Sequence, residues 1–567
     1  MIVHNRWRGA LARLIGVCAA LLLAASAASG VAATPAAASA GAAASAGAAA
    51  PAASAASAAS AAAGCQALLQ LRSARLTISV ARLVGAGPLP RAPGTPPLPP
   101  LQLPAHCLVQ GALDPRTGVH GRHYAIGFQL RLPLQWNGRF VYQGGAGLDG
   151  FIAPALGGAA GSSPPALLRG FAVVSTDGGH EGPDASFAAD QQARLDYAYA
   201  SIGKVSELAK QMIARFYGRR PSYSYLVGCS NGGRDAMMAA QRFPDDFDGV
   251  VAGDPGFHLS AAAIGEVWDT DQFSKVAPRD AQGRPILSRS FTTAELQQVS
   301  RAVLRQCDAL DGLADGMIND VAACHFDPAV LQCPAGVHQD CLSGAKLAVL
   351  RAVFDGAHDS AGHALYSPWP YDAGIGAPGW RAWKLGSAPS GASNAINATL
   401  GLNAMQLYFL TPPRPGLTDA SFDFDRDPPA VAQTAAINDA VSTFMTSFIA
   451  HGGRMLIYQG MSDPVFSADD IIRWYRELTR EFGPPQAWAR LFLVPGMNHC
   501  AGGPATDDFD ALTAIQQWTE HGVAPERLLA RGRAFPGITR PLCPYPKYAH
   551  YIGGDPHSAD SFECKAP

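Results

Sequence analysis

The chain has 567 residues, 48% of them hydrophobic, so it is long enough for one large domain or several ordinary ones. Its 43 Lys and Arg residues almost balance its 45 Asp and Glu residues, which gives a formal net charge of -2. This balance argues against nucleic acid or a membrane surface as a partner bound through bulk charge, and no internal stretch is long and apolar enough to span a bilayer.

The first 33 residues have the pattern of a secretory signal peptide. Three arginines form a basic start, residues 14–25 are apolar, and small-residue cleavage sites follow. This pattern predicts a protein that is secreted or periplasmic. Residues 34–64 are almost purely Ala, Ser, Gly and Pro. Because this segment has no apolar pattern, we expect a disordered linker that contributes nothing to the fold.

Strands and helices alternate from residue 124 onward. We expect strands over 124–132, 139–142, 171–176, 223–227, 247–252, 454–458 and 491–494, and helices over 199–216, 234–243 and 509–521. This alternation predicts an α/β fold with a mostly parallel sheet, whose functional loops lie at the carboxyl ends of the strands. Four candidate functional residues follow such strands: Gly147, Ser230, Asp463 and His499.

The alternation is lost between residues 256 and 441, where proline, glycine and four cysteines dominate the middle. We interpret this region as an inserted lid domain, held by disulfides rather than by a large core, that covers the sheet edge carrying Ser230. The main domain would then consist of residues 65–255 and 442–567.

The cysteine count indicates a disulfide-bonded protein. Ten cysteines follow the signal peptide, an even number that is expected to be oxidised after export. Local spacing suggests three pairs and leaves two more by elimination, although spacing alone does not fix the connectivity. The pairs are Cys307–Cys324, Cys333–Cys341, Cys543–Cys564, Cys65–Cys107 and Cys229–Cys500.

Residues 228–232, Gly-Cys-Ser-Asn-Gly, fit the pattern G-x-S-x-G, in which α/β-hydrolases place a nucleophilic serine on a tight strand-to-helix turn. Such a serine needs a base and a third group that orients the base, in the chain order Ser, Asp or Glu, His. Here these are Ser230, Asp463 and His499. The alternatives are a turn aspartate that caps a helix and a loop histidine without chemistry.

The neighbours of these residues carry further signals. A disulfide between Cys229 and Cys500 would join the serine turn to the histidine loop. Three other acids compete with Asp463, and we expect them to be structural: Asp177, Asp254 and Asp507.

An ester hydrolase also needs preorganised donors for the oxyanion that forms during attack. The backbone N–H of Asn231, directly after the serine, is one expected donor. The second should come from the glycine loop over residues 144–147. The alternative is a glycine turn that merely reverses the chain.

An acidic loop lies in the predicted lid. Asp308, Asp311 and Asp315 fall within eight residues and repel one another unless a cation or solvent separates them. Calcium takes oxygen ligands of this kind, although the string does not match an EF-hand loop. Flanking Cys307 and Cys324 would pin the loop, which favours a structural metal site over a solvated acidic turn.

Together these motifs resemble the tannase/feruloyl esterase family of α/β-hydrolases, from about residue 65 to the end of the chain. The matching segments are residues 228–234, 241–244, 248–256, 308–317, 495–500 and 540–546. The resemblance is close to the bacterial branch of MHETase-type enzymes. It implies an α/β-hydrolase fold with a large inserted lid domain that is held by disulfides and binds calcium. It also implies that the protein is a serine carboxylesterase, which acts on a small aromatic ester through an acyl-enzyme.

The resemblance also implies roles for individual residues. It points to a Ser230–His499–Asp463 triad with a Cys229–Cys500 bridge. It implies Gly147 and Asn231 as oxyanion donors, and an acyl pocket lined by Trp383, Phe466 and Leu259. It implies Ca²⁺ held by the side chains of Asp308, Asp311 and Asp315 and by the carbonyls of Leu313 and Met317.

One departure bears on the substrate. MHETase-type enzymes grip the free carboxylate of their substrate with a lid arginine, and the corresponding stretch here, residues 391–403, contains none. They also have a glutamate where this chain has Asn231. A buried carboxylate without a partner binds poorly, so we expect a phenolic acyl group such as ferulate, coumarate or gallate.

Two alternatives stay open. One is an MHETase-like hydrolase of terephthalate monoesters. The other is a catalytically silent, calcium-stabilised binding protein on the same scaffold.

Overall fold

The computed structural model describes residues 50–71, 73–89, 101–158, 163–337 and 339–567. The expected signal peptide and residues 34–49 of the expected linker lie outside these ranges. Among the helices of the described residues, none has the length and apolar character needed to cross a bilayer.

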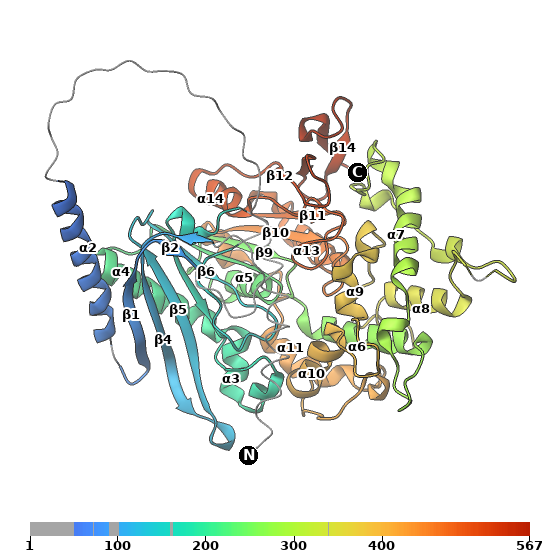
Figure 1. The fold of residues 1–567 in the computed structure, drawn as a ribbon, viewed down its shortest axis with the longest axis horizontal. Helices are drawn as coiled ribbons and strands as arrows, with labels where there is room; N and C mark the ends of the chain where they lie inside the picture. The colour runs from blue at the N-terminus through green and yellow to red at the C-terminus, as the bar shows by residue number, and fades with distance from the viewer. Residues whose placement is uncertain (1–49, 72, 90–100, 159–162, 338) are drawn as a thin grey trace.

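A nine-stranded mixed sheet forms the centre of the fold (Figure 1), in the order β1-β4-β5-β7-β6-β8-β9-β10-β11. The strands are β1 (Leu76–Val84), β4 (His106–Thr117), β5 (His123–Pro133), β6 (Arg139–Gln143), β7 (Ala172–Thr176), β8 (Tyr223–Cys229), β9 (Gly249–Gly253), β10 (Arg454–Gly460) and β11 (Ala489–Val494). Neighbours from β7 to β11 run parallel. The pairs β1–β4, β4–β5 and β5–β7 are antiparallel. The expected mostly parallel sheet is therefore confirmed, with an antiparallel part at its β1 end.

Helices cover both faces of the sheet because successive strand residues point to opposite sides. Phe140 packs with α4 (Ser201–Tyr217), α5 (Asn231–Arg242) and α13 (Ala468–Phe482) on one face. Its neighbour Val141 packs with α14 (Ala511–His521) on the other face. This layered arrangement brings the loops after β8, β10 and β11 to one edge of the sheet.

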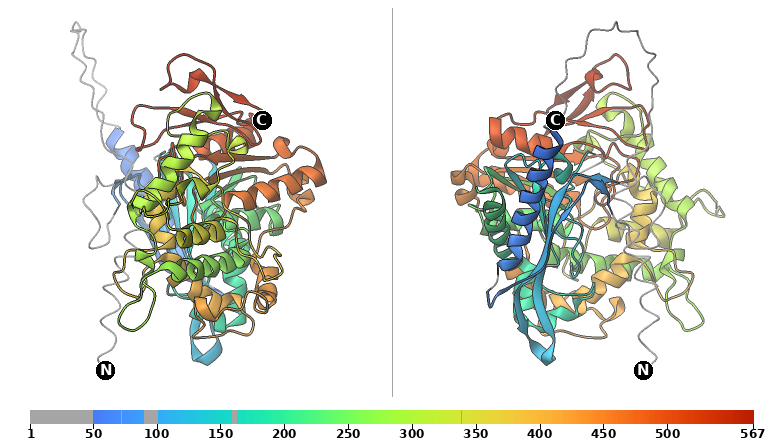
Figure 2. Two further views of the ribbon diagram at one scale, coloured as in Figure 1. Left: turned by 90° about the vertical axis from the view of Figure 1, so that its right-hand side faces the viewer. Right: turned by 60° about the vertical axis from the view of Figure 1, so that its left-hand side comes forward.

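The expected linker is wrong for its second half. Residues Ala50–Ala67 form helix α2, which packs along β1 (Figures 1 and 2). Alanine has the highest intrinsic helix propensity, so a run of alanines forms a helix wherever one end is fixed. That end is fixed here by the buried Cys65, which is bonded to Cys107 on β4.

Between β9 and β10 the chain leaves the sheet and forms a helical region. Its helices are α6 (Leu259–Val276), α7 (Thr293–Cys307), α8 (Gly344–Phe354), α9 (Pro378–Lys384), η11 (Asn397–Gly401), α10 (Leu402–Ala404), η12 (Met405–Phe409), α11 (Ala432–Asn438) and α12 (Thr446–His451). From α6 to α11 they lie beside the sheet rather than on its faces (Figures 1 and 2). Helix α12 instead packs Phe448 into the cluster on one face of the sheet. The expected boundaries at residues 256 and 441 fall just before α6 and between α11 and α12.

The expectation that disulfides rather than a core hold this region is wrong. A large cluster of buried apolar side chains lies mostly within it, including Trp268, Phe273, Leu350, Phe354 and Tyr408. These residues are spread over short helices and turns, which give no long periodic pattern in the sequence. The region therefore has a core of its own beside the sheet.

All five expected disulfides are present, namely Cys65–Cys107, Cys229–Cys500, Cys307–Cys324, Cys333–Cys341 and Cys543–Cys564. The last pair closes a small C-terminal hairpin of β14 (Tyr548–Tyr551) and β15 (Phe562–Lys565). Two further short pairs complete the strands, β2 (Gly87–Pro88) with β3 (Gln102–Leu103) and β12 (Leu528–Ala530) with β13 (Arg540–Leu542).

Candidate active site

Ser230 lies on the tight turn between β8 and α5 that the motif predicts. Its backbone has φ 64° and ψ -124°, a conformation that non-glycine residues rarely adopt. The turn is held by hydrogen bonds from the N–H of Ser230 to the carbonyl of Gly253 (2.9 Å) and from the N–H of Gly256 to the carbonyl of Ser230 (3.1 Å). A Cβ on Gly228 would lie 2.6 Å from the backbone of Gly232, so the motif glycines are needed for the turn to close.

The structure brings Ser230, His499 and Asp463 together. Nε2 of His499 lies 2.8 Å from Oγ of Ser230, and Nδ1 of His499 lies 2.9 Å from Oδ2 of Asp463. The other oxygen of Asp463 accepts the backbone N–H groups of Val465 (2.7 Å) and Phe466 (3.2 Å). These contacts place the Nδ1 proton toward Asp463 and leave Nε2 free to accept the proton of Ser230.

The surroundings of His499 make its imidazole more basic. Burial alone would lower the pKa of His499, but the charge and hydrogen bond of Asp463, with a smaller contribution from Asp254, raise it above the ordinary value. His499 is thus electrostatically suited to hold the proton that it would take from Ser230.

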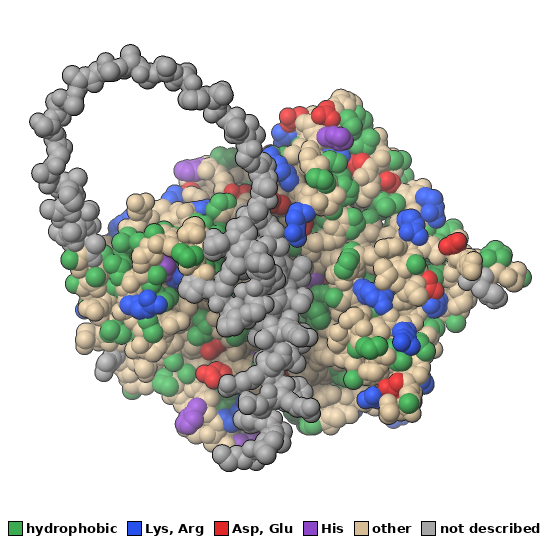
Figure 3. Space-filling model, in the orientation of Figure 1, with side chains coloured by type: hydrophobic (Ala, Val, Ile, Leu, Met, Phe, Trp, Pro, Cys, Tyr) green, Lys and Arg blue, Asp and Glu red, His purple; other side chains and the backbone are tan. Residues whose placement is uncertain are grey.

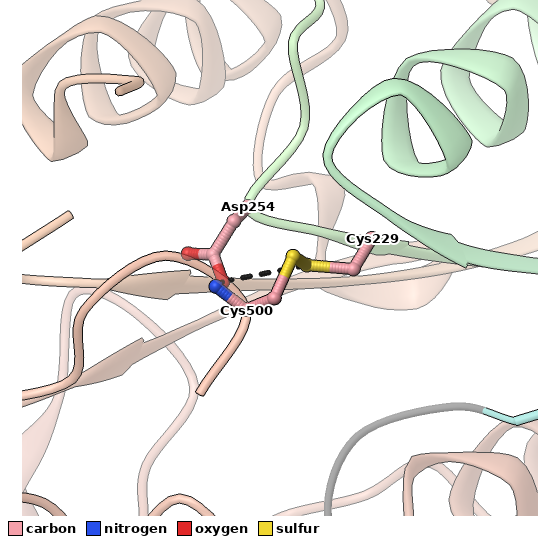
Figure 4. A group of neighbouring side chains, drawn as sticks. All are labelled: Cys229, Asp254 and Cys500. Atoms are coloured by element: carbon pink, nitrogen blue, oxygen red, sulfur yellow. Dashed lines mark hydrogen bonds between the residues drawn. A yellow bond between two sulfur atoms is a disulfide. The ribbon is translucent and has the colours of Figure 1, made fainter. Parts of the chain in front are cut away.

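Asp254 joins the two loops that carry the acid and the base. It follows β9, and its carboxyl oxygens accept the N–H of Gly460 at the end of β10 (2.6 Å) and the N–H of Cys500 beside His499 (2.9 Å). Figure 4 shows the Asp254 carboxyl group beside Cys229 and Cys500. Burial and the nearby Asp463 charge raise the pKa of Asp254 well above its ordinary range. The sequence placed Asp254 among the structural acids, and no sequence signal shows that it holds the His499 loop.

A disulfide sulfur of Cys229 also lies 3.6 Å from this carboxyl group. Cys229, Asp254 and Cys500 are therefore close enough to hold a metal ion. Because Cys229 and Cys500 are bonded to each other, neither can supply the thiolate that a metal requires. The cluster is a structural clamp.

The predicted oxyanion donors lie beside the Ser230 turn. A Cβ on Gly144 would lie 2.6 Å from the Cα of Gly232, so the glycine loop packs directly on the turn. Gly147 has φ 58°, and its carbonyl accepts the hydroxyl of Tyr197 (3.2 Å). Within the described residues no acceptor for the Gly147 N–H is present. As the first residue of α5, Asn231 has a backbone N–H with no acceptor inside the helix.

Two of the three predicted acyl-pocket residues flank the base. The ring centre of Trp383 lies 5.1 Å from that of His499, and the ring centre of Phe466 lies 5.4 Å from it. The third residue, Leu259, is the first residue of α6 and is partly buried. Since Gly256 is hydrogen-bonded to Ser230, α6 begins close to the Ser230 turn.

The helical region is fixed to the catalytic loops by hydrogen bonds. The side-chain oxygen of Asn498, next to His499, accepts the N–H of Trp380 (3.2 Å) at the start of α9. The N–H of Gly374 donates to the hydroxyl of Ser462 (2.8 Å), next to Asp463. These contacts place Trp383 against His499.

The acidic loop is ordered by its own backbone. Asp308 accepts the N–H groups of Asp315 and Gly316, and Asp311 accepts those of Leu313 and Asn319. One oxygen of Asp315 accepts from the buried guanidinium of Arg540. Among the described residues, the carboxylates of Asp308, Asp311 and Asp315 are not drawn together into one cluster of ligand atoms.

The chemistry of this loop nevertheless suits a hard cation. The expected ligands are all carboxylate or carbonyl oxygens, which calcium prefers. Burial, together with the negative charge of Asp315, raises the pKa of Asp311 to about 6. A bound cation would relieve this electrostatic cost.

The chain is similar in sequence to known proteins of one family. A family model described as tannase and feruloyl esterase matches residues 107–565. The chain is 43% identical over 517 residues to mono(2-hydroxyethyl) terephthalate hydrolase of Piscinibacter sakaiensis, covering 82% of this chain and 85% of that protein. It is 28% identical to a probable feruloyl esterase of Arthroderma benhamiae, covering 86% and 90% of the two chains.

The fold is also similar to solved structures. Feruloyl esterase B from Aspergillus oryzae superposes with a TM-score of 0.75 at 24% identity, covering 89% of this chain and 100% of that chain. Tannin acyl hydrolase from Aspergillus niger superposes with a TM-score of 0.63 at 21% identity, covering 88% and 93%. At these identities the structural similarity establishes the shared fold.

Proposed function

We propose that this chain, which belongs to the tannase and feruloyl esterase family and is a carboxylic ester hydrolase, is a secreted serine esterase that cleaves esters of phenolic acids. The observation that carries the proposal is the position of His499 between the Ser230 hydroxyl and the Asp463 carboxylate. The proposal includes two further statements, that the acyl group is phenolic and that the protein is exported.

The geometry supports a two-step reaction. His499 Nε2 takes the proton of Ser230 while Oγ attacks the ester carbonyl carbon, and the N–H groups of Gly147 and Asn231 stabilise the oxyanion. The alcohol leaves with the proton held on Nε2, and the acyl group stays on Ser230. Nε2 then takes a proton from water, which attacks the acyl-enzyme and releases the acid and the Ser230 hydroxyl. Asp463 orients the imidazole throughout.

Replacing the serine tests this mechanism. We expect Ser230→Ala to lower kcat by about 10⁴-fold or more and to abolish labelling by a fluorophosphonate probe, because no other group replaces the nucleophile. Ser442→Ala, at an exposed serine, should keep both properties. Near-normal activity of the Ser230→Ala protein would overturn the proposal. A wild-type protein that is inert toward the probe would favour a binding protein instead.

The acyl specificity is tested by a substrate panel. Methyl ferulate, methyl gallate and chlorogenate present phenolic acyl groups, whereas mono(2-hydroxyethyl) terephthalate presents a carboxylate. Because residues 391–403 contain no arginine, we expect a phenolic ester to give the highest kcat/KM. Terephthalate monoester hydrolysis is the second candidate function, and the 43% identity to such an enzyme favours it.

Two further parts of the proposal concern the environment of the protein. Five disulfides and the expected signal peptide support export to an oxidising compartment. On the face in Figure 3, cationic and anionic side chains of the described residues are interspersed, which suits a small neutral or phenolic ester better than a polyelectrolyte.

We also propose that Ca²⁺ binds the loop of Asp308, Asp311 and Asp315 and stabilises the fold without taking part in bond breaking.

A further inference from the structure

Two polar side chains near the candidate acyl pocket accept or donate no side-chain hydrogen bond within the described part of the chain. We propose that Glu266 on α6 and Asn397 on η11 form the distal end of this pocket and bind the phenolic hydroxyl group of the substrate. The inference rests on the proposed esterase function of the same site. It assigns the specificity for a phenolic ring to Glu266, which no sequence motif indicated, and to Asn397, which lies in the stretch 391–403 that contains no arginine.

The position of Glu266 follows from the geometry of α6. Leu259 and Glu266 are seven residues apart, so they lie on nearly the same face of the helix. The helix rises about 1.5 Å per residue, which places Glu266 about 10 Å beyond Leu259 along the axis. This spacing is comparable to the length of a hydroxycinnamoyl group. An acyl group bound with its carbonyl at Ser230 would therefore direct its far end toward Glu266.

Helix η11 lies on the side of this pocket opposite α6. A Cβ on Gly147 would lie 3.8 Å from Cδ2 of Leu400, so η11 approaches the oxyanion loop. At the next residue, any side chain on Gly401 would collide with the carboxyl group of Glu266. The same turn of η11 therefore reaches from the oxyanion loop to Glu266, and Gly401 leaves room for the carboxyl group.

Both polar groups lack hydrogen bonds. The side chain of Asn397 is buried, at 2% exposure, and neither its oxygen nor its nitrogen has a partner in the described structure. Asn397 and Gly401 are four residues apart on η11, so both lie on the side that faces α6. The carboxyl group of Glu266 is also largely buried, and we find no described donor to it. Buried polar groups are nearly always paired, so the unpaired amide of Asn397, on the helix that adjoins Glu266, indicates a ligand.

The charges around Glu266 favour a neutral ligand. Burial raises the pKa of Glu266 to about 8, with Lys384 of α9 opposing the rise and Asp269 and Asp463 adding to it. The carboxyl group is therefore mostly protonated at pH 7 and can both donate and accept. Lys384, the described cation that acts on Glu266, is buried in an ion pair with Asp269 and is not free to bind a substrate carboxylate.

The two side chains match a phenol in hydrogen-bonding capacity. The phenolic hydroxyl can donate to a carboxyl oxygen of Glu266 and accept from the amide nitrogen of Asn397. A terephthalate carboxylate would instead be buried beside an acid and an amide without a free cation, at a large desolvation cost. The same pair of residues thus explains both the phenolic preference and the absence of an arginine.

The ratio of the kcat/KM values for two substrates tests the inference. Methyl p-coumarate and methyl cinnamate differ only in the phenolic hydroxyl group. We expect the wild-type protein to prefer the coumarate in kcat/KM by about tenfold to a hundredfold, the effect of one or two buried hydrogen bonds. Glu266→Leu and Asn397→Leu should each bring this ratio close to one, mainly through a higher KM for the coumarate, while turnover of the cinnamate persists.

The conservative variant Glu266→Gln provides the matched control. Its amide keeps a donor and an acceptor, so the coumarate preference should survive within a few-fold. Since each ratio compares two substrates in one protein sample, partial misfolding cancels. An unchanged ratio in both leucine variants would overturn the inference while leaving the Ser230 mechanism intact. Failure of the mechanism itself would show as probe-insensitive activity in the Ser230→Ala protein.

Discussion

At the scale of single residues, His499 predicts how the rate depends on pH. The net effect of its surroundings raises its pKa above the ordinary value of about 6.5. A protonated imidazole cannot accept the Ser230 proton, so activity is lost as the pH falls through this pKa. We therefore expect the acid limb of kcat/KM for methyl ferulate to have its midpoint above pH 6.5. A midpoint at or below this value would contradict the electrostatic role assigned to Asp463.

Asp254 gives a second prediction at this scale. Asp254→Asn replaces one acceptor oxygen by an NH₂ group, so either Gly460 or Cys500 loses its hydrogen-bond acceptor. We expect the free energy of unfolding to fall by about 1–3 kcal/mol. We also expect kcat to fall while KM changes little, because the His499 loop loses its anchor. Thermal or denaturant unfolding and steady-state kinetics measure the two effects.

Asp177 provides the matched control for this variant. It is also a buried acid that accepts two backbone N–H groups, those of Gly127 and Gly179, both at 2.9 Å. Both N–H groups donate to the same oxygen, Oδ1, so Asp177→Asn can keep both bonds on its amide oxygen. It should cost less stability than Asp254→Asn and leave kcat unchanged. Equal losses of kcat in both variants would show that Asp254 acts on stability alone.

The residues that could be predicted from the sequence are those that carry a local signature. Ser230 lies in a glycine-framed motif, and Asp463 and His499 each follow a buried strand in the expected chain order. Glu266 and Asn397 have no such signature. We assign them a role because their side chains are buried without hydrogen-bond partners among the described residues, and this can be seen only in the packed structure.

At the scale of elements, strand prediction succeeded where strands are buried on both faces. Strands β8 to β11 are short apolar runs, and the structure confirms them. Strands β1 and β4 were missed because they are partly exposed and antiparallel, and β4 contains glycine and proline. The core of the helical region could not be predicted, because its apolar residues are divided among many short segments.

The disulfide between the Ser230 turn and the His499 loop predicts an effect on activity. Cys229 and Cys500 are 271 residues apart in the chain and adjoin the two reacting groups. We expect the Cys229→Ala, Cys500→Ala double variant to lose about tenfold or more in kcat and about 2–5 kcal/mol in unfolding free energy. Unfolding curves and kinetics under oxidising conditions measure both quantities.

Cys333–Cys341 is the control disulfide, because it closes a separation of eight residues in the helical region. Removing it should leave kcat close to the wild-type value. If the Cys333→Ala, Cys341→Ala double variant lost the same fraction of kcat as the Cys229→Ala, Cys500→Ala variant, the Cys229–Cys500 bridge would have no special role in aligning the serine and the base.

At the scale of the whole molecule, the acidic loop connects the helical region to the C-terminal hairpin. Cys307–Cys324 closes the loop on one side, and Leu313 packs on the hairpin cluster of Cys543, Ala549 and Phe562. Arg540 is ion-paired with Asp315 and also lies over the ring of Phe562, 4.4 Å from its centre. A cation bound in the loop would therefore tie two distant parts of the chain together.

This arrangement predicts a calcium-dependent stability with a calcium-independent rate. Calcium at a hundred times its Kd would add about 2.7 kcal/mol to the unfolding free energy, so Tm of metal-stripped protein should rise as calcium is added. Magnesium should give a smaller rise because it demands a stricter octahedral geometry, and Asp311→Asn should reduce the calcium response. The initial rate on methyl ferulate at 25 °C should stay constant, since the loop contacts the hairpin rather than the triad. A Tm insensitive to calcium would identify the loop as an acidic turn held by Arg540, whereas an immediate loss of rate on chelation would place the ion in the chemistry.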